Sequence, residues 1–123
     1  MTISKESIKI TKLDAAERQL LEAIRLFFEE RDPVCVHTLA AAAVGVLDDL
    51  ARSKGMSRPL RDSARIAPEH RNDWIAAINA AQNFFKHADR DPDASLEFRP
   101  GTTAFLMIGS GLALSQACRS LVA

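Results

Sequence analysis

Apolar residues recur at intervals of three and four along most of this chain, with polar residues between them. That spacing puts the apolar side chains on one face of an α-helix. It predicts four helices, at about residues 12–31, 33–54, 69–88 and 103–121. The segment between the second and third helices is rich in proline and arginine and is expected to be a loop.

Residues that start and stop helices stand at the ends of these stretches. Thr11 followed by Asp14 is a capping box for the first helix. Asp32 is a good N-cap, and Pro33 fits the first helical position, where its missing N–H costs nothing. Gly55 is a stop signal for the second helix.

Short connections between long helices favour an all-α fold, a small antiparallel four-helix bundle in one domain over residues 1–123. The run Ala40 to Ala43 is small on every side, so neighbouring helices can approach it closely. Apolar and polar residues also alternate at Ile8–Ile10 and at Leu96–Phe98, and these segments are expected to form a minor β-pair.

Composition adds little to this picture. The chain has 16 basic and 16 acidic residues, so its overall charge predicts neither a nucleic acid nor an acidic partner. The apolar run at 103–118 is too short and too mixed to span a bilayer, and the N-terminus lacks the apolar core of a signal peptide. We therefore expect a cytoplasmic protein with no membrane partner, in which Cys35 and Cys118 are buried, reduced thiols.

No metal or other cofactor is expected. Asp89, Asp91 and Asp93 have the spacing of the first ligands in a calcium loop, but Pro100 stands where that loop needs its closing glutamate. The three histidines show no metal-binding spacing either. His37 shares a helix face with apolar residues, so we expect it to be partly buried and hydrogen-bonded.

The third predicted helix carries a second stripe, opposite its main apolar face. Ala76, Ala80, Asn83 and His87 follow one another at intervals of three and four. A solvated face would more often carry Glu, Lys and Arg, so the stripe is a candidate surface for another helix, a second copy of the chain or a ligand. The alternative is that Asn83 and His87 are only surface or capping residues near the helix end.

The stretch QNFFKHADRDPD, with CVHTLAAAAVGVLDDLA before it and SLEFRPGTTAFLMIGSGLAL after it, resembles bacterial HEPN-like helical domains. The likeness covers most of the chain, but its specific part is one short motif. It implies a bundle of four or five helices and a homodimer, with Ala76, Ala80 and Asn83 near the two-fold axis. Active members of that family are metal-independent ribonucleases, while others bind nucleotides or have lost activity.

Carried onto this chain, the resemblance assigns Asn83 to the polar position of the motif and His87 to its histidine. The arginine position holds Gln82, which has donors but no charge. RNA cleavage needs a proton acceptor, which histidine can be, and a cation against the phosphorane charge. Lys86 is the candidate substitute for that cation, although it lies about 100° from His87 around the helix.

The loop between the second and third helices adds a secondary candidate. Arg58 and Arg61 could contact phosphates, or could belong to a solvated connector. The favoured hypothesis is a non-catalytic HEPN-like module that binds a nucleotide, an RNA or a companion protein through Gln82, Asn83, His87 and these arginines. The alternatives are a metal-independent ribonuclease that uses His87 and Lys86, and a structural or assembly protein.

Overall fold

The computed structural model describes residues 5–55, 68–108 and 111, and within them the protein is helical without any strand. The elements are α1 (Lys12–Phe28), α2 (Pro33–Ser53), the 3₁₀ turn η1 (Pro68–His70) and α3 (Arg71–Lys86). Residues 102–108 form a further helical segment. The expected all-α class is confirmed.

The first turn of α1 is held as the capping box predicts. The Thr11 hydroxyl accepts from the Asp14 N–H at 3.0 Å, and the Asp14 carboxylate accepts from the Thr11 N–H at 3.2 Å. The hydrogen bond from the Thr11 backbone is the main cause that lowers the pKa of Asp14 below its usual value.

The end of α1 is shaped by a residue in the left-handed region. Glu30 has φ 54°, its N–H donates to the Phe27 carbonyl at 3.1 Å, and the Arg31 N–H donates to the Leu26 carbonyl at 3.0 Å. These two bonds form a Schellman motif, in which glycine is the usual left-handed residue. The motif ends the helix at Phe28, short of the predicted end near Arg31.

Replacing Glu30 by glycine is expected to stabilise the protein by about 1 kcal/mol, because it removes the left-handed strain of a residue that has a Cβ atom. Urea unfolding of the variant measures this. Glu30→Ala is the matched control, since it removes the charge but keeps the strain. Equal stability of the two variants would contradict this account.

Helix α2 starts and stops where its signals predict. The Asp32 carboxylate accepts from the N–H groups of Val34 at 2.8 Å and Cys35 at 3.4 Å, and Pro33 occupies the first helical position. Gly55 follows the C-cap with φ 72°, a conformation that favours glycine.

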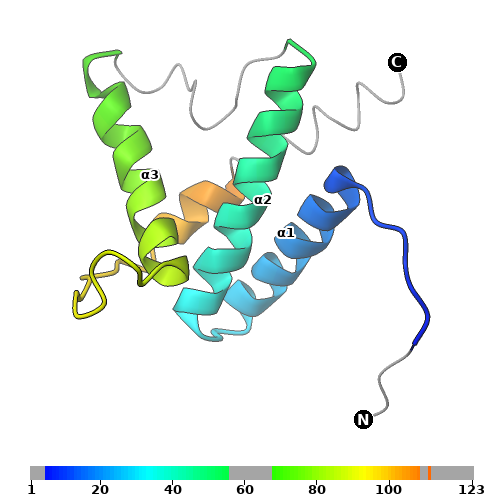
Figure 1. The fold of residues 1–123 in the computed structure, drawn as a ribbon, viewed down its shortest axis with the longest axis horizontal. Coiled ribbons are helices and arrows are strands. Elements are labelled where there is room, and N and C mark those ends of the chain that lie inside the picture. Colours follow the sequence, from blue (N-terminus) through cyan, green and yellow to red (C-terminus); the bar gives the residue numbers. More distant parts are fainter. Residues whose placement is uncertain (1–4, 56–67, 109–110, 112–123) are drawn as a thin grey trace.

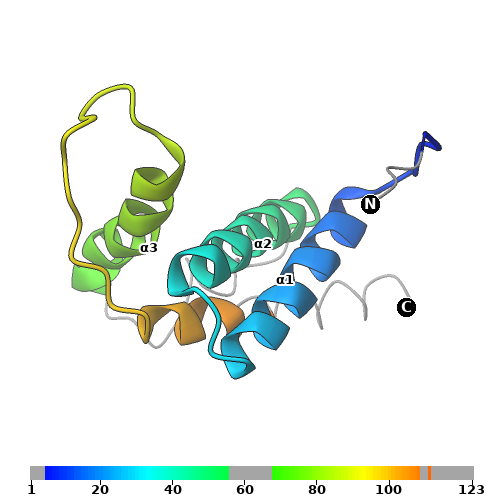
Figure 2. The same cartoon turned by 90° about the horizontal axis from the view of Figure 1, so that it is seen from below.

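Most of the core lies where α1 packs against α2 (Figures 1 and 2). Alanines fill the contact on both helices, so the two backbones come close together. The helical segment 102–108 adds Leu106 to the same core. The buried apolar residues are Ala16, Leu20, Ala23, Val36, Ala40, Ala41, Ala43, Val44, Leu47, Ala51 and Leu106.

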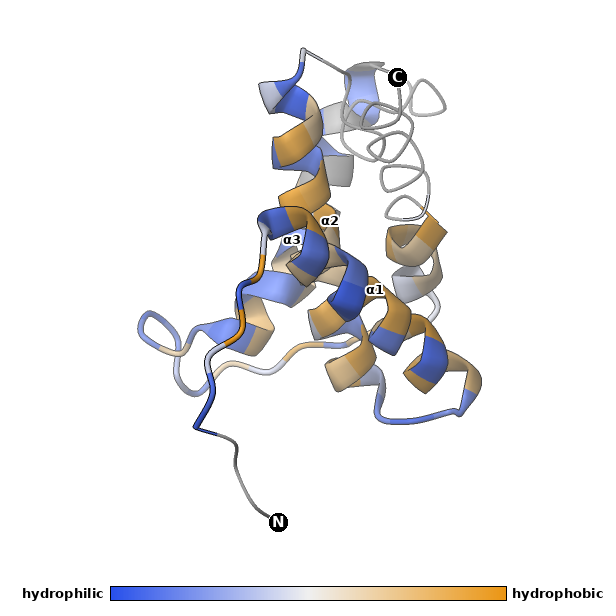
Figure 3. Cartoon of the chain, turned by 90° about the vertical axis from the view of Figure 1, so that its right-hand side faces the viewer, coloured by the Kyte–Doolittle hydropathy of each residue, from blue (hydrophilic) through white to orange (hydrophobic). Residues whose placement is uncertain are grey.

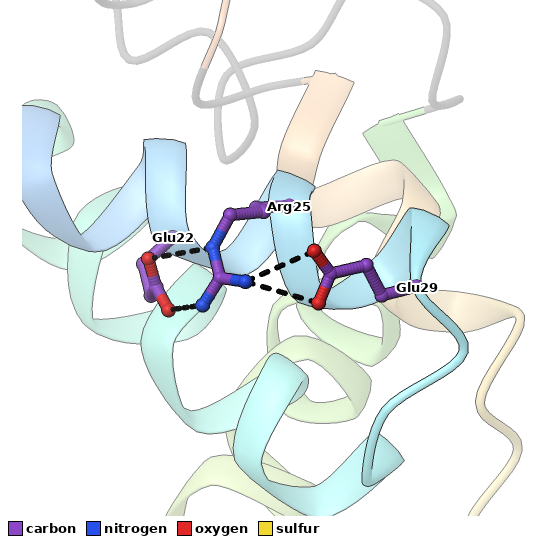
Figure 4. Close-up of polar contacts among 3 residues, drawn as sticks. All are labelled: Glu22, Arg25 and Glu29. Carbon is purple, nitrogen blue, oxygen red and sulfur yellow. Dashed lines mark hydrogen bonds and ion pairs between the residues drawn. The ribbon is translucent and has the colours of Figure 1, made fainter.

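The outer face of α1 is charged, and Figure 3 shows hydrophilic and hydrophobic residues alternating around its turns. Arg25 donates to the carboxylates of Glu22 and Glu29 (Figure 4), with the Glu29 contacts at 3.0 Å. These contacts raise the pKa of Arg25, and the hydrogen bond from Arg25 lowers the pKa of Glu22. The cluster is exposed and links neighbouring turns of one helix, so it stabilises α1 locally.

By length and composition, α2 is the one helix in the described part of the chain that could cross a membrane. A helix buried in a protein core has the same composition. Here the small apolar residues of α2 face α1 and Leu106, which explains why the helix is so apolar.

Two expectations are wrong within the described residues. Residues 8–10 and 96–98 form no strands, and Ile8 is 68% exposed. An alternation of three residues is too short to specify a strand pair. Cys35 is a free thiol but an exposed one, because it lies beside Val36 on the helix and only Val36 faces the core. Cys118 lies outside the described residues.

Candidate functional site

The C-terminal end of α3 and the loop that follows it lie together. His87 is the C-cap of α3, in an extended conformation with φ −133° and ψ 140°, and its N–H donates to the Asn83 carbonyl at 3.1 Å. A turn follows, in which the Ala94 N–H donates to the Asp91 carbonyl at 3.1 Å. The chain then runs back beside α3 to the helical segment 102–108 (Figures 1 and 2).

This arrangement forms an open groove of about 490 Å³ between α3 and the returning chain. One wall comes from α3 and the other from the loop and the first residues after it. The lining residues are Ala80, Asn83, Phe84, His87, Asp89, Arg90, Asp91 and Leu96.

The groove combines an apolar surface with several polar groups. Phe84 and Leu96 supply the apolar part, from opposite sides. The Asn83 amide and the His87 imidazole are exposed on α3, and the exposed Arg90 guanidinium is a cation at the same groove. The carboxylates of Asp89 and Asp91 flank Arg90 in the chain and give the site both signs of charge.

This groove and the stripe predicted on α3 share three residues. Ala80, Asn83 and His87 line the groove, whereas Ala76 is exposed on α3 but outside the lining. Gln82 is half-buried and Lys86 is exposed, and neither of them lines the groove.

Arg58 and Arg61 lie outside the described residues. Sequence reasoning missed Arg90, which comes after the end of α3, where a helical wheel no longer gives a position. The signal available was its place three residues after His87 in a loop rich in aspartate.

A buried polar contact joins α2 to the helical segment 102–108. His37 of α2 is 3% exposed, and its Nδ1 is 2.9 Å from the Thr103 hydroxyl oxygen. Its ring meets those of Phe85 and Phe98 edge to face, with centroids 5.8 Å and 5.0 Å away. The predicted hydrogen-bonded histidine is confirmed, and burial lowers its pKa.

Among the residues that the structure describes, no three His, Cys, Asp or Glu side chains are grouped so that they could hold a metal ion. Asp89, Asp91 and Asp93 are all exposed. The turn closed by the Asp91–Ala94 hydrogen bond accounts for part of this acidic sequence, because aspartate and proline are common turn residues.

Comparison of the chain with protein-family models, with curated proteins and with solved structures gives no match.

Proposed function

We propose that the protein is a non-catalytic, HEPN-like binding module whose ligand occupies the groove at the end of α3. The observation that carries this proposal is that three residues of the predicted stripe, Ala80, Asn83 and His87, line one groove. The small side chain of Ala80 leaves room there, while Asn83 and His87 offer hydrogen bonds. The four-helix or five-helix bundle arrangement belongs to the same proposal.

The chemistry of the groove favours a nucleotide over a companion protein. Its volume of about 490 Å³ falls within the range of small-molecule sites. Phe84 and Leu96 offer apolar surface to a base, and the Asn83 amide can both donate to and accept from a base edge. The Arg90 guanidinium can bind a phosphate through two hydrogen bonds, and the aspartates can accept from ribose hydroxyls.

The absence of catalysis in this proposal follows from Gln82. It stands in the motif position of the arginine, carries no charge and does not line the groove. Lys86, the candidate substitute, does not line the groove either. Arg90 is a cation at the groove, so RNA cleavage is kept as an outcome of the experiment below.

We expect nucleoside 5′-monophosphates to bind the wild type, and Asn83→Ala and Arg90→Ala each to weaken binding at least about tenfold, the effect of a lost charge-assisted or paired hydrogen bond. Isothermal titration calorimetry measures the affinity. Lys86→Ala is the matched control, because it removes an exposed cation of α3 outside the groove, and it should bind as the wild type does.

A short single-stranded RNA tests the other outcomes in the same samples. Cleavage that persists in a chelator and is lost in His87→Ala would replace the proposal with the ribonuclease. No binding of nucleotide or RNA at millimolar ligand would overturn it in favour of a companion protein or a structural role. Light scattering of these samples tests the proposed homodimer, for which the exposed Ala76 and Ala80 are the interface candidates.

A further inference from the structure

We propose that neutral His37 holds the two walls of the α3 groove together, and that protonation of His37 below neutral pH opens the groove. This inference deepens the proposed function, on which it rests for its biological meaning. The structural part concerns only the groove itself and can be tested without a ligand.

Three rings from three segments form a closed cluster around His37. The imidazole of His37 belongs to α2, Phe85 to α3 and Phe98 to the chain that returns from the loop. The two phenyl rings also meet each other, with centroids 5.1 Å apart and planes at 70°. Each ring therefore contacts the other two, and the Thr103 hydroxyl fixes one edge of the imidazole.

The same two segments supply the apolar walls of the groove. Phe84 precedes Phe85 on α3, and their ring centroids are 6.1 Å apart. Leu96 lies two residues before Phe98 in the returning chain. Loss of the contacts around His37 would leave the direct Phe85–Phe98 contact as the remaining link of this ring cluster between α3 and the returning chain. The distance between Phe84 and Leu96 would then be less tightly fixed.

The surroundings of His37 suit a neutral ring and not a charged one. Its Nε2 is buried and has no hydrogen-bond partner among the described residues. A protonated ring would carry two N–H donors and a positive charge, of which Thr103 could satisfy only one donor. A buried positive charge beside phenyl rings is unfavourable unless a carboxylate is paired with it.

Among the described residues, the charged groups on the neighbouring segments do not offset the cost of a buried charge on His37. Lys86 follows Phe85, Glu97 and Arg99 flank Phe98, and all three are exposed. On α2, the N-cap Asp32 is exposed, and Asp48 lies about 16 Å further along the helix at 1.5 Å per residue. On α1, the charged side chains are exposed or half-exposed. Burial lowers the pKa of His37, and no charged group among the described residues contributes to that shift.

The sign of the pH effect follows from this lowered pKa. At pH values between the pKa of His37 in the folded chain and its unfolded value of 6.5, the unfolded chain binds more protons than the folded chain. The contribution of neutral His37 to stability is therefore complete above pH 6.5 and is lost as the pH falls through that window. The groove should open as this contribution disappears.

The test is a pair of measurements on the whole chain between pH 7.5 and pH 5.5. Amide spectra by NMR should show the signals of Asn83, Phe84 and Leu96 shifting or broadening on acidification, and the Tm should fall by about 4 °C or more. In His37→Asn, which cannot titrate but can still bond to Thr103, both changes should largely vanish. His87→Gln removes the exposed histidine that lines the groove, and the fall in Tm and the changes at Phe84 and Leu96 should persist in it.

Unchanged groove signals at pH 5.5 in the wild type, or an equal pH response in His37→Asn, would overturn the inference. If His37→Asn does not fold, titration of the imidazole signals in the wild type decides. The groove signals must then change in the pH range in which the His37 ring is protonated. These outcomes need no ligand, so a failure to bind nucleotide is distinguishable from a failure of the pH response.

Discussion

Replacing Leu20 by alanine is expected to lower the free energy of unfolding by about 2–5 kcal/mol, the range for leucines cut back in a packed core. Leu20 is 2% exposed and is among the largest fully enclosed side chains in the described residues. Alanine would leave a cavity on the inner face of α1. Ala16 and Ala23, which lie one turn away on the same buried face, are too short to fill the space.

The neighbouring Leu21 supplies the matched control, because it lies on the same helix and is 56% exposed. Urea unfolding of Leu21→Ala should give a loss below about 0.5 kcal/mol. Both changes replace leucine by alanine in a helix, so helix propensity cancels and the difference reports burial. Similar losses in the two variants would mean that the inner face of α1 is misassigned.

Replacing a small core residue of α2 by a larger one should destabilise the protein. Ala40 has no exposed surface and lies in the core cluster with Ala23 of α1 and Leu106. Leucine at this position adds three carbon atoms where the helices are close, and overpacking of this kind costs about 1–3 kcal/mol. We expect Ala40→Leu to lower the Tm by at least about 4 °C.

Thermal unfolding followed by circular dichroism measures this effect, with Ala42→Leu as the control. Ala42 is half-buried on the same helix, two residues on, so leucine there can extend toward solvent. Its Tm should change by less than half as much. A Tm of Ala40→Leu equal to that of the wild type would contradict the close approach of the helices.

Much of the fold could be predicted because it is decided locally. Thr11 with Asp14, and Asp32 with Pro33, mark helix starts through side chains that bond to backbone groups within three residues. The end of α1 could not be predicted in the same way. Glu30 takes a conformation that normally favours glycine, so composition carries no sign of the Schellman motif.

Only those residues of the candidate site that follow the helical repeat of α3 could be predicted from the sequence. Asn83 and His87 are one turn apart on α3, and spacing alone placed them together. Arg90 lies beyond the helix end, where the path of the chain depends on tertiary contacts. The contact between His37 and Thr103 joins residues 66 positions apart, which no local pattern encodes.

The likeness to HEPN-like domains stays a prediction. It depends on a short motif in which Gln82 replaces the arginine, and the helical class of the fold is shared by many unrelated functions. The nucleotide titration and the RNA assay test it directly.

The brief connection between α1 and α2 has a consequence for the order of folding. Only residues 29–32 separate the two helices, so closing this loop costs little chain entropy. The alanine-lined contact can therefore form early, from segments that are neighbours in the chain. The contact between His37 and Thr103 joins residues 66 positions apart, so the docking of α2 against the chain around the groove should follow later, on a hairpin that already exists.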